Sequence, residues 1–387
     1  MRRRWRVGFL AALLAFAEIY SLLPSSLRPA AQAPAPRRLG AFHVPGWLGD
    51  TPIRRSEIAR AASASGLEFV IVTHPPNRPL PWSEGPEGDV DVLVEIEEKG
   101  PAGDLVRLRT ASNGSTEAHT DHSSGGQGLT VIAHPSHPTR PWAQLERHAD
   151  GIEIGNLGAR WADLVTNEWW DSAVILGCLP VNAFLASLRF VRWHPKDLAA
   201  WDGMNSVSGG HFGILGHDEP PPLGIPERIT GRRWPGYPET FRLAANAILA
   251  DEAWAEDFSR RREQLYHLIR RGRLAVVVTT LFPFQGNDWR MECPKSIHVP
   301  GDLVTDSRDC RFVVDTPHGL PFARHLRLLR NGELEAERST HSARAEIPFP
   351  GKPGAYRLEV LAAAHTASGM LLRHPVPYVF YNPIYVR

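Results

Sequence analysis

The sequence has almost no net charge and few cysteines. Its 43 lysines and arginines are balanced by 42 aspartates and glutamates, which leaves a formal charge of +1 at pH 7. Binding to nucleic acid rests on a basic surface, so this balance gives no indication of nucleic acid as a partner. There are three cysteines in 387 residues and no Cys-x-x-Cys pair. That absence argues against a cysteine-based structural zinc site.

The three cysteines occupy two different settings. Cys178 lies in the apolar run AVILGCLP, which is typical of a buried free thiol. Cys293 and Cys310 flank a loop-like segment in a region rich in strand patterns. An oxidising compartment would permit a disulfide between them, and the sequence leaves that pairing open.

The N-terminus differs in character from the rest of the chain. Arginines at positions 2, 3, 4 and 6 precede Val7–Leu23, an apolar stretch whose only charge is Glu18. This favours an uncleaved signal anchor, a single-pass transmembrane helix over 1–23 with the body of the protein outside the cytoplasm. Ala31-Gln-Ala33 keeps a cleaved signal peptide and a secreted protein as the alternative. A buried N-terminal helix is a third interpretation. A Pro/Ala-rich linker follows over 24–38.

Short apolar strands alternate with helical patterns from Leu39 onwards. Strand patterns occur at 39–44, 66–73, 91–97, 105–110, 128–134, 150–155 and 212–218. The second of these, GLEFVIVT, is apolar almost throughout, as expected for a buried parallel strand. Helical patterns connect the strands at 57–65 (with Ser56 as N-cap), 142–148, 157–165 and 195–204. This order predicts an α/β fold, and a barrel is its natural closed form.

The pattern changes after a long helical region, Pro238–Arg271, which ends at Gly272. Beyond it, short strands separated by turn residues predominate, and Asn331-Gly332 is a strong hairpin sequence. The spacing predicts an antiparallel β-sandwich. We therefore predict two folded domains, an α/β barrel over 39–275 and a β-sandwich over 276–387.

Polar side chains that can bind metal occur where the predicted barrel strands end. They are His43, His74, Glu95, His134, Glu153 with Asn156, and Asp218. Because a parallel barrel brings the carboxyl ends of its strands to one mouth, we expect these imidazoles and carboxylates to converge there. Such groups bind Zn, Mn or Fe, and activation of water is the chemistry that such a site offers.

Each of these residues also has a purely structural interpretation. A histidine at a strand end is often simply hydrogen-bonded, and no two of these residues have the compact spacing of a metal motif. Glu95 lies beside Glu97 and Glu98, any of which can be a solvated surface charge, and Asp218 can cap the following turn. The histidines at 119 and 122 lie in a Ser/Gly-rich segment that favours a polar loop. Core packing is also the favoured role of Trp169, Trp170, Trp193, Trp201, Trp234 and Trp289.

Taken in order, these motifs resemble the PHP family, the polymerase and histidinol phosphatase type. The likeness covers nearly all of the chain after residue 39, and its later blocks are WDGMNS, GYPETFRLAANAIL, LIRRGRLAVV, LRLLRNGELEAE, PGKPGAYRLEV and YNPIYV. The resemblance implies a distorted seven-stranded (β/α) barrel, followed in the long form by a C-terminal β domain. It also implies two or three bound metals and hydrolysis of phosphoesters.

The first two metal motifs depart from the family pattern. The family's first motif is Asp-x-His-x-His, and the matching residues here are Ala41, His43 and Pro45. Its second motif is Thr-Asp-His-Asn, in which His74 and Pro75 replace the aspartate and the histidine. The resemblance therefore leaves His43 and His74 as the candidate ligands from this part of the chain.

The later motifs are better retained. Glu95 matches the bridging carboxylate, and Asp104 stands where a histidine is usual. The His-Pro motif is present as His134 and its proline, and the last motif keeps Asp218 but has Pro220 in place of a histidine. The resemblance thus implies Glu95, His134 and Asp218 as further ligands, with Asp104 as an additional candidate.

Proline cannot bind a metal through its side chain, so the substitutions imply a degenerate centre with one or two divalent metals at most, or none.

Two functions stay open. The first is a metal-dependent hydrolase of reduced activity that acts on a phosphorylated small molecule. The second is a catalytically inactive barrel that serves as a binding or scaffolding module at the cell envelope.

Overall fold

The computed structural model describes residues 37–100, 103–109, 128–137, 141–142, 149–168, 172, 175, 191, 193–218, 236–280, 284, 286–317, 323–363 and 375–387. The predicted anchor at 1–23, the linker up to residue 36, Cys178, the 119–122 segment and Pro220 lie outside these ranges. Within the ranges, no helix is both long and apolar enough to cross a membrane. Arg37 and Arg38, which we placed at the end of the linker, instead begin the first strand.

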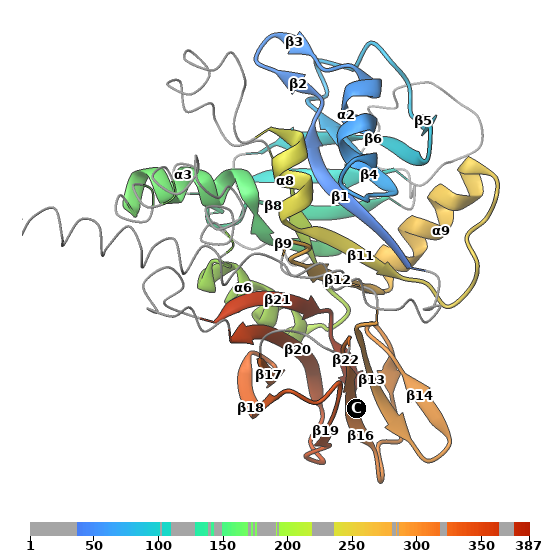
Figure 1. Ribbon diagram of the computed structural model, residues 1–387, viewed down its shortest axis with the longest axis vertical. Helices are drawn as coiled ribbons and strands as arrows, with labels where there is room; N and C mark the ends of the chain where they lie inside the picture. The colour runs from blue at the N-terminus through green and yellow to red at the C-terminus, as the bar shows by residue number, and fades with distance from the viewer. Residues whose placement is uncertain are drawn as a thin grey trace, which may run out of the picture.

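A closed barrel of seven strands forms the upper part of the molecule in Figure 1. Its strands, in order around the barrel, are β1 (Arg37–Pro45), β4 (Phe69–His74), β6 (Val90–Lys99), β7 (Asp104–Leu108), β8 (Leu129–Ala133), β9 (Gly151–Asn156) and β10 (Phe212–Gly216), which returns to β1. Each strand coincides with a predicted one. Three short strands accompany the barrel, namely β2 (Trp47–Leu48), β3 (Thr51–Pro52) and β5 (Gly85–Glu87).

One strand runs against the expected direction. Neighbouring strands are parallel except that β7 is antiparallel to both β6 and β8. The connection from β6 to β7 is a tight turn in which the backbone N–H of Gly100 donates to the carbonyl of Gly103 at 2.9 Å. A parallel neighbour would require a crossover of a dozen or more residues, so this turn permits only antiparallel pairing.

Two buried asparagines complete the barrel beside β10. Because β1 and β10 pair through one register position, the remaining edge of β10 needs other partners. Asn246 bonds both the N–H and the carbonyl of Leu215 at 2.9 Å, and Asn382 bonds those of Gly213 at 2.7 and 2.9 Å. Both asparagines are fully buried. These amides replace missing strand contacts and fix the strand that leads to Asp218.

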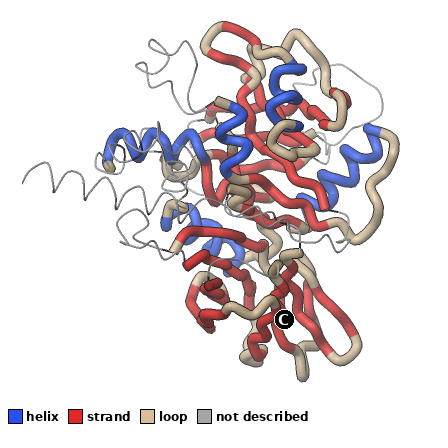
Figure 2. Tube along the Cα trace, in the orientation of Figure 1, coloured by secondary structure: helices blue, strands red, loops and turns tan. Residues whose placement is uncertain are grey.

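The helices within the described residues are α2 (Arg55–Ser63), α3 (Leu157–Asn167), α6 (Pro195–Val207), α8 (Tyr237–Leu243) and α9 (Phe258–Arg270). Figure 2 shows that the lower part of the molecule is built from strands and loops. The first helix has Arg54 as its N-cap, without a capping side-chain bond, so Ser56 is not the N-cap. The C-terminal end of α9 is as expected, with Gly272 at φ +71.

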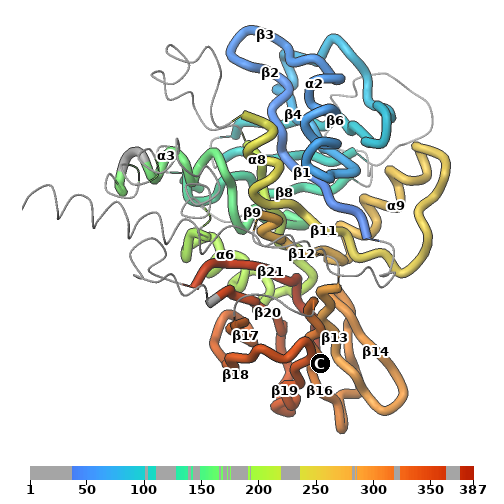
Figure 3. The backbone as a smooth tube through the Cα atoms, in the orientation of Figure 1, coloured from blue at the N-terminus to red at the C-terminus, as the bar shows by residue number. Residues whose placement is uncertain are grey.

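The prediction of a continuous helix over Pro238–Arg271 is wrong. The segment is divided into α8, the strand β11 (Ala245–Leu249) and α9. The apolar run of β11 is drawn into antiparallel pairing with β1 on one side and with β12 (Leu274–Val277) on the other. Tertiary pairing therefore overrides the helical propensity of this Ala/Leu-rich stretch. Figure 3 shows the result, with the yellow β11 beside the blue β1.

The last part of the chain forms two antiparallel sheets around a shared core. One sheet contains β13 (Asp288–Cys293), β14 (Ser296–His298), β16 (Arg311–Asp315) and β19 (Arg344–Pro348). The other continues the barrel sheet, because β12 pairs with β21. It contains β17 (Ala323–Arg330), β18 (Glu333–Thr340), β20 (Gly354–Ala363) and β21 (Val376–Tyr381), with β22 (Ile384–Val386) beside β20 and β15 (Leu303–Val304) parallel to β22. Trp289, Phe312, Tyr356 and Tyr381 are among the aromatic residues of the core. The predicted hairpin at Asn331-Gly332 joins β17 to β18.

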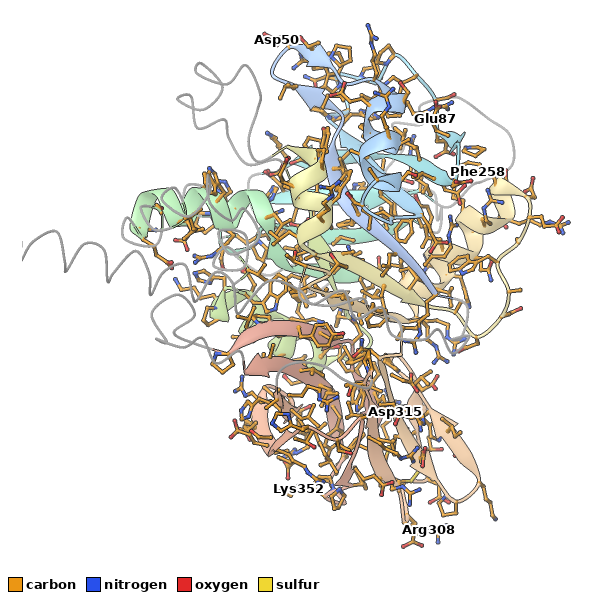
Figure 4. The ribbon with its side chains drawn as sticks, in the orientation of Figure 1. Asp50, Glu87, Phe258, Arg308, Asp315 and Lys352 are labelled. Atoms are coloured by element: carbon orange, nitrogen blue, oxygen red, sulfur yellow. A yellow bond between two sulfur atoms is a disulfide. The ribbon has the colours of Figure 1, made fainter. Side chains whose placement is uncertain are left out.

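A disulfide joins Cys293 to Cys310. These cysteines lie next to the register pair Glu292–Arg311 of β13 and β16, so the bond crosses between adjacent strands. In Figure 4, Asp315 and Arg308 mark this strand-rich part, and Asp50 marks the opposite end of the molecule. The predicted domain boundary after residue 275 falls within β12 and stays a prediction.

Candidate metal centre

The two histidines nearest the centre of the barrel mouth lie on unusual backbone. His43 has φ +57 and lies in a bulge of β1, where the register with β4 shifts between Ala41 and Val44. His134 follows β8 directly and has φ +33. Such backbone costs of order 1–3 kcal/mol in a non-glycine residue, and bulges re-aim side chains beside functional sites. Here they bring the two imidazole rings together, with centroids 5.0 Å apart.

Glu97 completes a cluster with these two histidines. Glu97 Oε2 lies 3.6 Å from His43 Nε2, and its Oε1 lies 3.7 Å from His134 Nε2. One ligand atom from each of the three residues lies within 4.8 Å of the others. Two imidazole nitrogens and a carboxylate are a donor set suited to Zn, Mn or Fe, so the residues fit a divalent ion.

Glu153 orients both histidines from behind the cluster. Its fully buried carboxylate accepts hydrogen bonds from His43 Nδ1 at 2.7 Å, from the backbone N–H of His134 at 2.7 Å and from Asn156 Nδ2 at 2.8 Å. Because a carboxylate only accepts, His43 donates through Nδ1 and presents Nε2 to the mouth. A carboxylate on the second ring nitrogen is typical of a metal-ligating histidine. Gly216 is required here, since a Cβ would lie 2.2 Å from Glu153 Oε1.

Two of the predicted aspartates flank His134. Asp104 is the first residue of β7, and its Oδ2 lies 3.4 Å from His134 Nε2. The reversed direction of β7 is what brings this residue to the mouth, in register with Ala133. Asp218 follows β10, and its Oδ2 lies 3.7 Å from His134 Nδ1. The structure thus gathers His43, His134, Asp104 and Asp218 at one place.

The pKa values of the three cluster residues are strongly shifted from their ordinary values. Burial opposes protonation of His43, but Glu153 and Glu97 outweigh it and hold the pKa of His43 well above its ordinary value. Burial likewise lowers the pKa of His134, but Asp104, Glu97 and Glu153 raise it to about 9. Burial raises the pKa of Glu97, yet the two histidines bring that pKa well below its ordinary range. Binding of a metal ion would therefore release protons from both imidazoles.

His74 lies apart from the three-residue cluster. It ends β4, is buried, and donates through Nδ1 to the carbonyl oxygen of Pro75 at 2.8 Å. That bond turns one ring nitrogen toward its own backbone. The role of His74 as a metal ligand stays a prediction.

Glu95 also makes contacts away from the cluster. Its Oε1 accepts from Tyr266 Oη at 2.5 Å and from Arg262 Nη2 at 3.0 Å, and its Oε2 accepts from the backbone N–H of Arg109 at 2.8 Å. Tyr266 and Arg262 belong to α9, so Glu95 links that helix to the barrel wall. The structure brings Glu97, two residues further along β6, to the place that the resemblance gave to Glu95, whose role as a ligand stays a prediction.

The sequence patterns place Glu153 among the candidate metal-binding residues at strand ends, but they do not show that it orients the histidines, and they give no ligand role to Glu97. Glu97 is one of three neighbouring glutamates in the sequence, and strand alternation puts it on the same face as Glu95 and nearer the mouth. Glu153 lies within an otherwise apolar, fully buried strand, and a charged residue in such a strand is a signal of a functional role.

The chain is thus a closed, mixed α/β barrel with an imidazole–carboxylate cluster at its mouth, joined to antiparallel sheets. No family model matches it, and no curated protein does. Among solved structures it is similar to a two-domain protein from Bacteroides vulgatus ATCC 8482 described as containing a predicted PHP-like metal-dependent phosphoesterase. The two share 11% sequence identity with a TM-score of 0.38, over 93% of this chain and all of the other. The geometry of the site therefore carries the functional argument.

Proposed function

We propose that the barrel mouth binds one divalent metal ion, Mn, Fe or Zn, through His43, Glu97 and His134. We further propose that this centre hydrolyses a phosphoester of a small molecule, as the resemblance to the PHP family implies. The observation that supports the proposal is the convergence of two imidazoles on strained backbone with a carboxylate, in a site whose His43 is oriented by a second carboxylate.

The surrounding residues have distinct roles in this proposal. A bound divalent ion supplies Lewis-acid activation of a water molecule and of a phosphoryl oxygen. Glu153 keeps His43 in the tautomer that presents Nε2. Asp104 and Asp218 lie on either side of His134 and extend the acidic rim. Burial raises the pKa of Asp218, so this carboxyl is suited to holding a proton at the mouth.

The test is the metal content of the purified full-length protein after expression with Mn, Fe and Zn supplied. We expect close to one equivalent in the wild type and a loss of metal in His134→Ala. As a matched control we choose His211→Gln, because His211 is also buried but bonds Ala149 O and Ser208 Oγ instead of the cluster. Less than a tenth of an equivalent in the wild type would overturn the proposal. Turnover of simple phosphoesters by the loaded protein is the second measurement.

An inactive binding or scaffolding barrel is the alternative, and one observation favours it. The histidines and carboxylates of the cluster compensate each other's charge without a metal ion, as the raised pKa of His134 and the lowered pKa of Glu97 indicate. A self-compensated cluster would predict a folded protein that takes up no metal and hydrolyses no phosphoester. The same metal analysis separates the two functions.

We also propose that the chain is anchored in a membrane by a single pass, with its body outside the cytoplasm, and that a secreted form is the alternative. The arginines followed by Val7–Leu23 support this placement. The Cys293–Cys310 disulfide supports it as well, because disulfides persist in oxidising compartments. Fractionation of cells would test it, since recovery of the chain in the cytoplasm with both cysteines reduced would contradict the proposal.

A further inference from the structure

A small pocket adjoins the metal centre on the side of α3 and α6. Ser136, Asn156, Arg160, His194 and Asp197 contribute to its wall. Asn156 connects the pocket to the centre, because its Nδ2 bonds Glu153 Oε2 and lies 3.1 Å from His134 Nδ1. We call it the α6 pocket, since His194 and Asp197 come from the start of that helix.

Two residues of the α6 pocket carry buried polar atoms without a hydrogen-bond partner in the described part of the chain. Asp197 is 6% exposed, and its Oδ1 accepts no hydrogen bond. Arg160 is held in place by Asp163 and Glu168 through its terminal nitrogens, yet its Nε donates to no acceptor. An unpartnered buried polar atom costs about 1–3 kcal/mol, so these two wall residues leave one acceptor and one donor unsatisfied.

We propose that the α6 pocket binds a hydroxyl group on the alcohol portion of the phosphoester, which makes the substrate the ester of a polyol. The inference rests on the proposed function, because the metal centre would hold the phosphate. A hydroxyl group both donates and accepts, so it matches an unpaired acceptor such as Asp197 Oδ1 and an unpaired donor such as Arg160 Nε. An ammonium group can only donate, and an alkyl group would leave both atoms unpaired. Sites built around a hydroxyl group discriminate strongly against analogues that lack it.

The experiment compares two non-hydrolysable ligands, 3,4-dihydroxybutylphosphonate and butylphosphonate, by titration calorimetry with the full-length, manganese-loaded protein. We expect the dihydroxy compound to bind at least tenfold more tightly. We expect Asp197→Ala to reduce this preference to threefold or less. Lys196→Ala is the matched control, because Lys196 is the exposed neighbour in the same helical turn, and it should retain the full preference.

Each outcome either supports or overturns the assignment of the α6 pocket as a hydroxyl-binding site. Equal binding of the two phosphonates to the wild type overturns the pocket assignment while leaving the metal centre standing, and it needs no variant. A tenfold preference that survives in folded Asp197→Ala also overturns it. If manganese binds but neither phosphonate does, the proposed phosphoester function fails and the pocket assignment fails with it.

Discussion

Replacing Glu153 by glutamine tests how the metal centre is held together. Glu153 accepts from His43 Nδ1, from the His134 backbone and from Asn156, all within 2.8 Å, and it is fully buried. An amide retains one acceptor oxygen and turns an NH₂ group toward donors that need an acceptor. We expect divalent metal affinity to fall about 10–100-fold, the range seen when an outer partner of a ligating histidine is lost. That corresponds to about 1.4–2.7 kcal/mol of binding free energy.

The assay is titration of metal-free protein with Mn²⁺ or Zn²⁺ in a calorimeter. Asp91→Asn is the matched control, because Asp91 is a buried carboxylate that pairs with Arg38 and Arg261 at the other end of the barrel. We expect this control to lose stability but keep the metal affinity of the wild type. A Glu153→Gln protein that binds metal within twofold of the wild type would refute the reasoning that Glu153 orients the histidines.

Three further predictions concern the metal ligands, the buried Asn246 and the buried His217. Glu97→Gln should abolish stoichiometric metal binding while Glu95→Gln retains it, and the reverse result in metal analysis would restore Glu95 as the ligand. Asn246→Leu should lower the free energy of unfolding by about 2–6 kcal/mol in a urea titration, because both backbone groups of Leu215 lose their partner; a loss below about 1 kcal/mol would contradict this. Burial lowers the pKa of His217 to about 4, below its ordinary 6.5, so it binds its proton more readily when unfolded and stability should fall by about 3 kcal/mol between pH 6.5 and 4. This loss should be absent in His217→Gln when the two proteins are compared in pH-dependent unfolding.

The barrel strands could be predicted because each is an apolar run ended by a polar residue or a turn. The β11 strand could not, since Ala245–Leu249 resembles a helix until β1 and β12 supply partners on both of its edges. The direction of β7 follows from the short separation between the end of β6 and the start of β7, where the N–H of Gly100 bonds the carbonyl of Gly103.

The candidate metal centre could be predicted only in part from the sequence. His43, His134 and Asp218 could be identified because single residues at strand ends are visible without a structure. The choice between Glu95 and Glu97 depends on how far β6 extends toward the mouth, which its pairing with β7 beyond the end of β4 shows. Positive φ at His43 and His134 has no counterpart in the residue types, so the strain that marks these positions appears only in the fold.

Anomalous diffraction from crystals of the manganese-loaded protein tests the central claim most directly. The account predicts a single strong anomalous peak at the barrel mouth, bounded by His43 Nε2, His134 Nε2 and the Glu97 carboxylate. A peak centred on Glu95 or His74 instead, or no peak in crystals grown with saturating manganese, would contradict it.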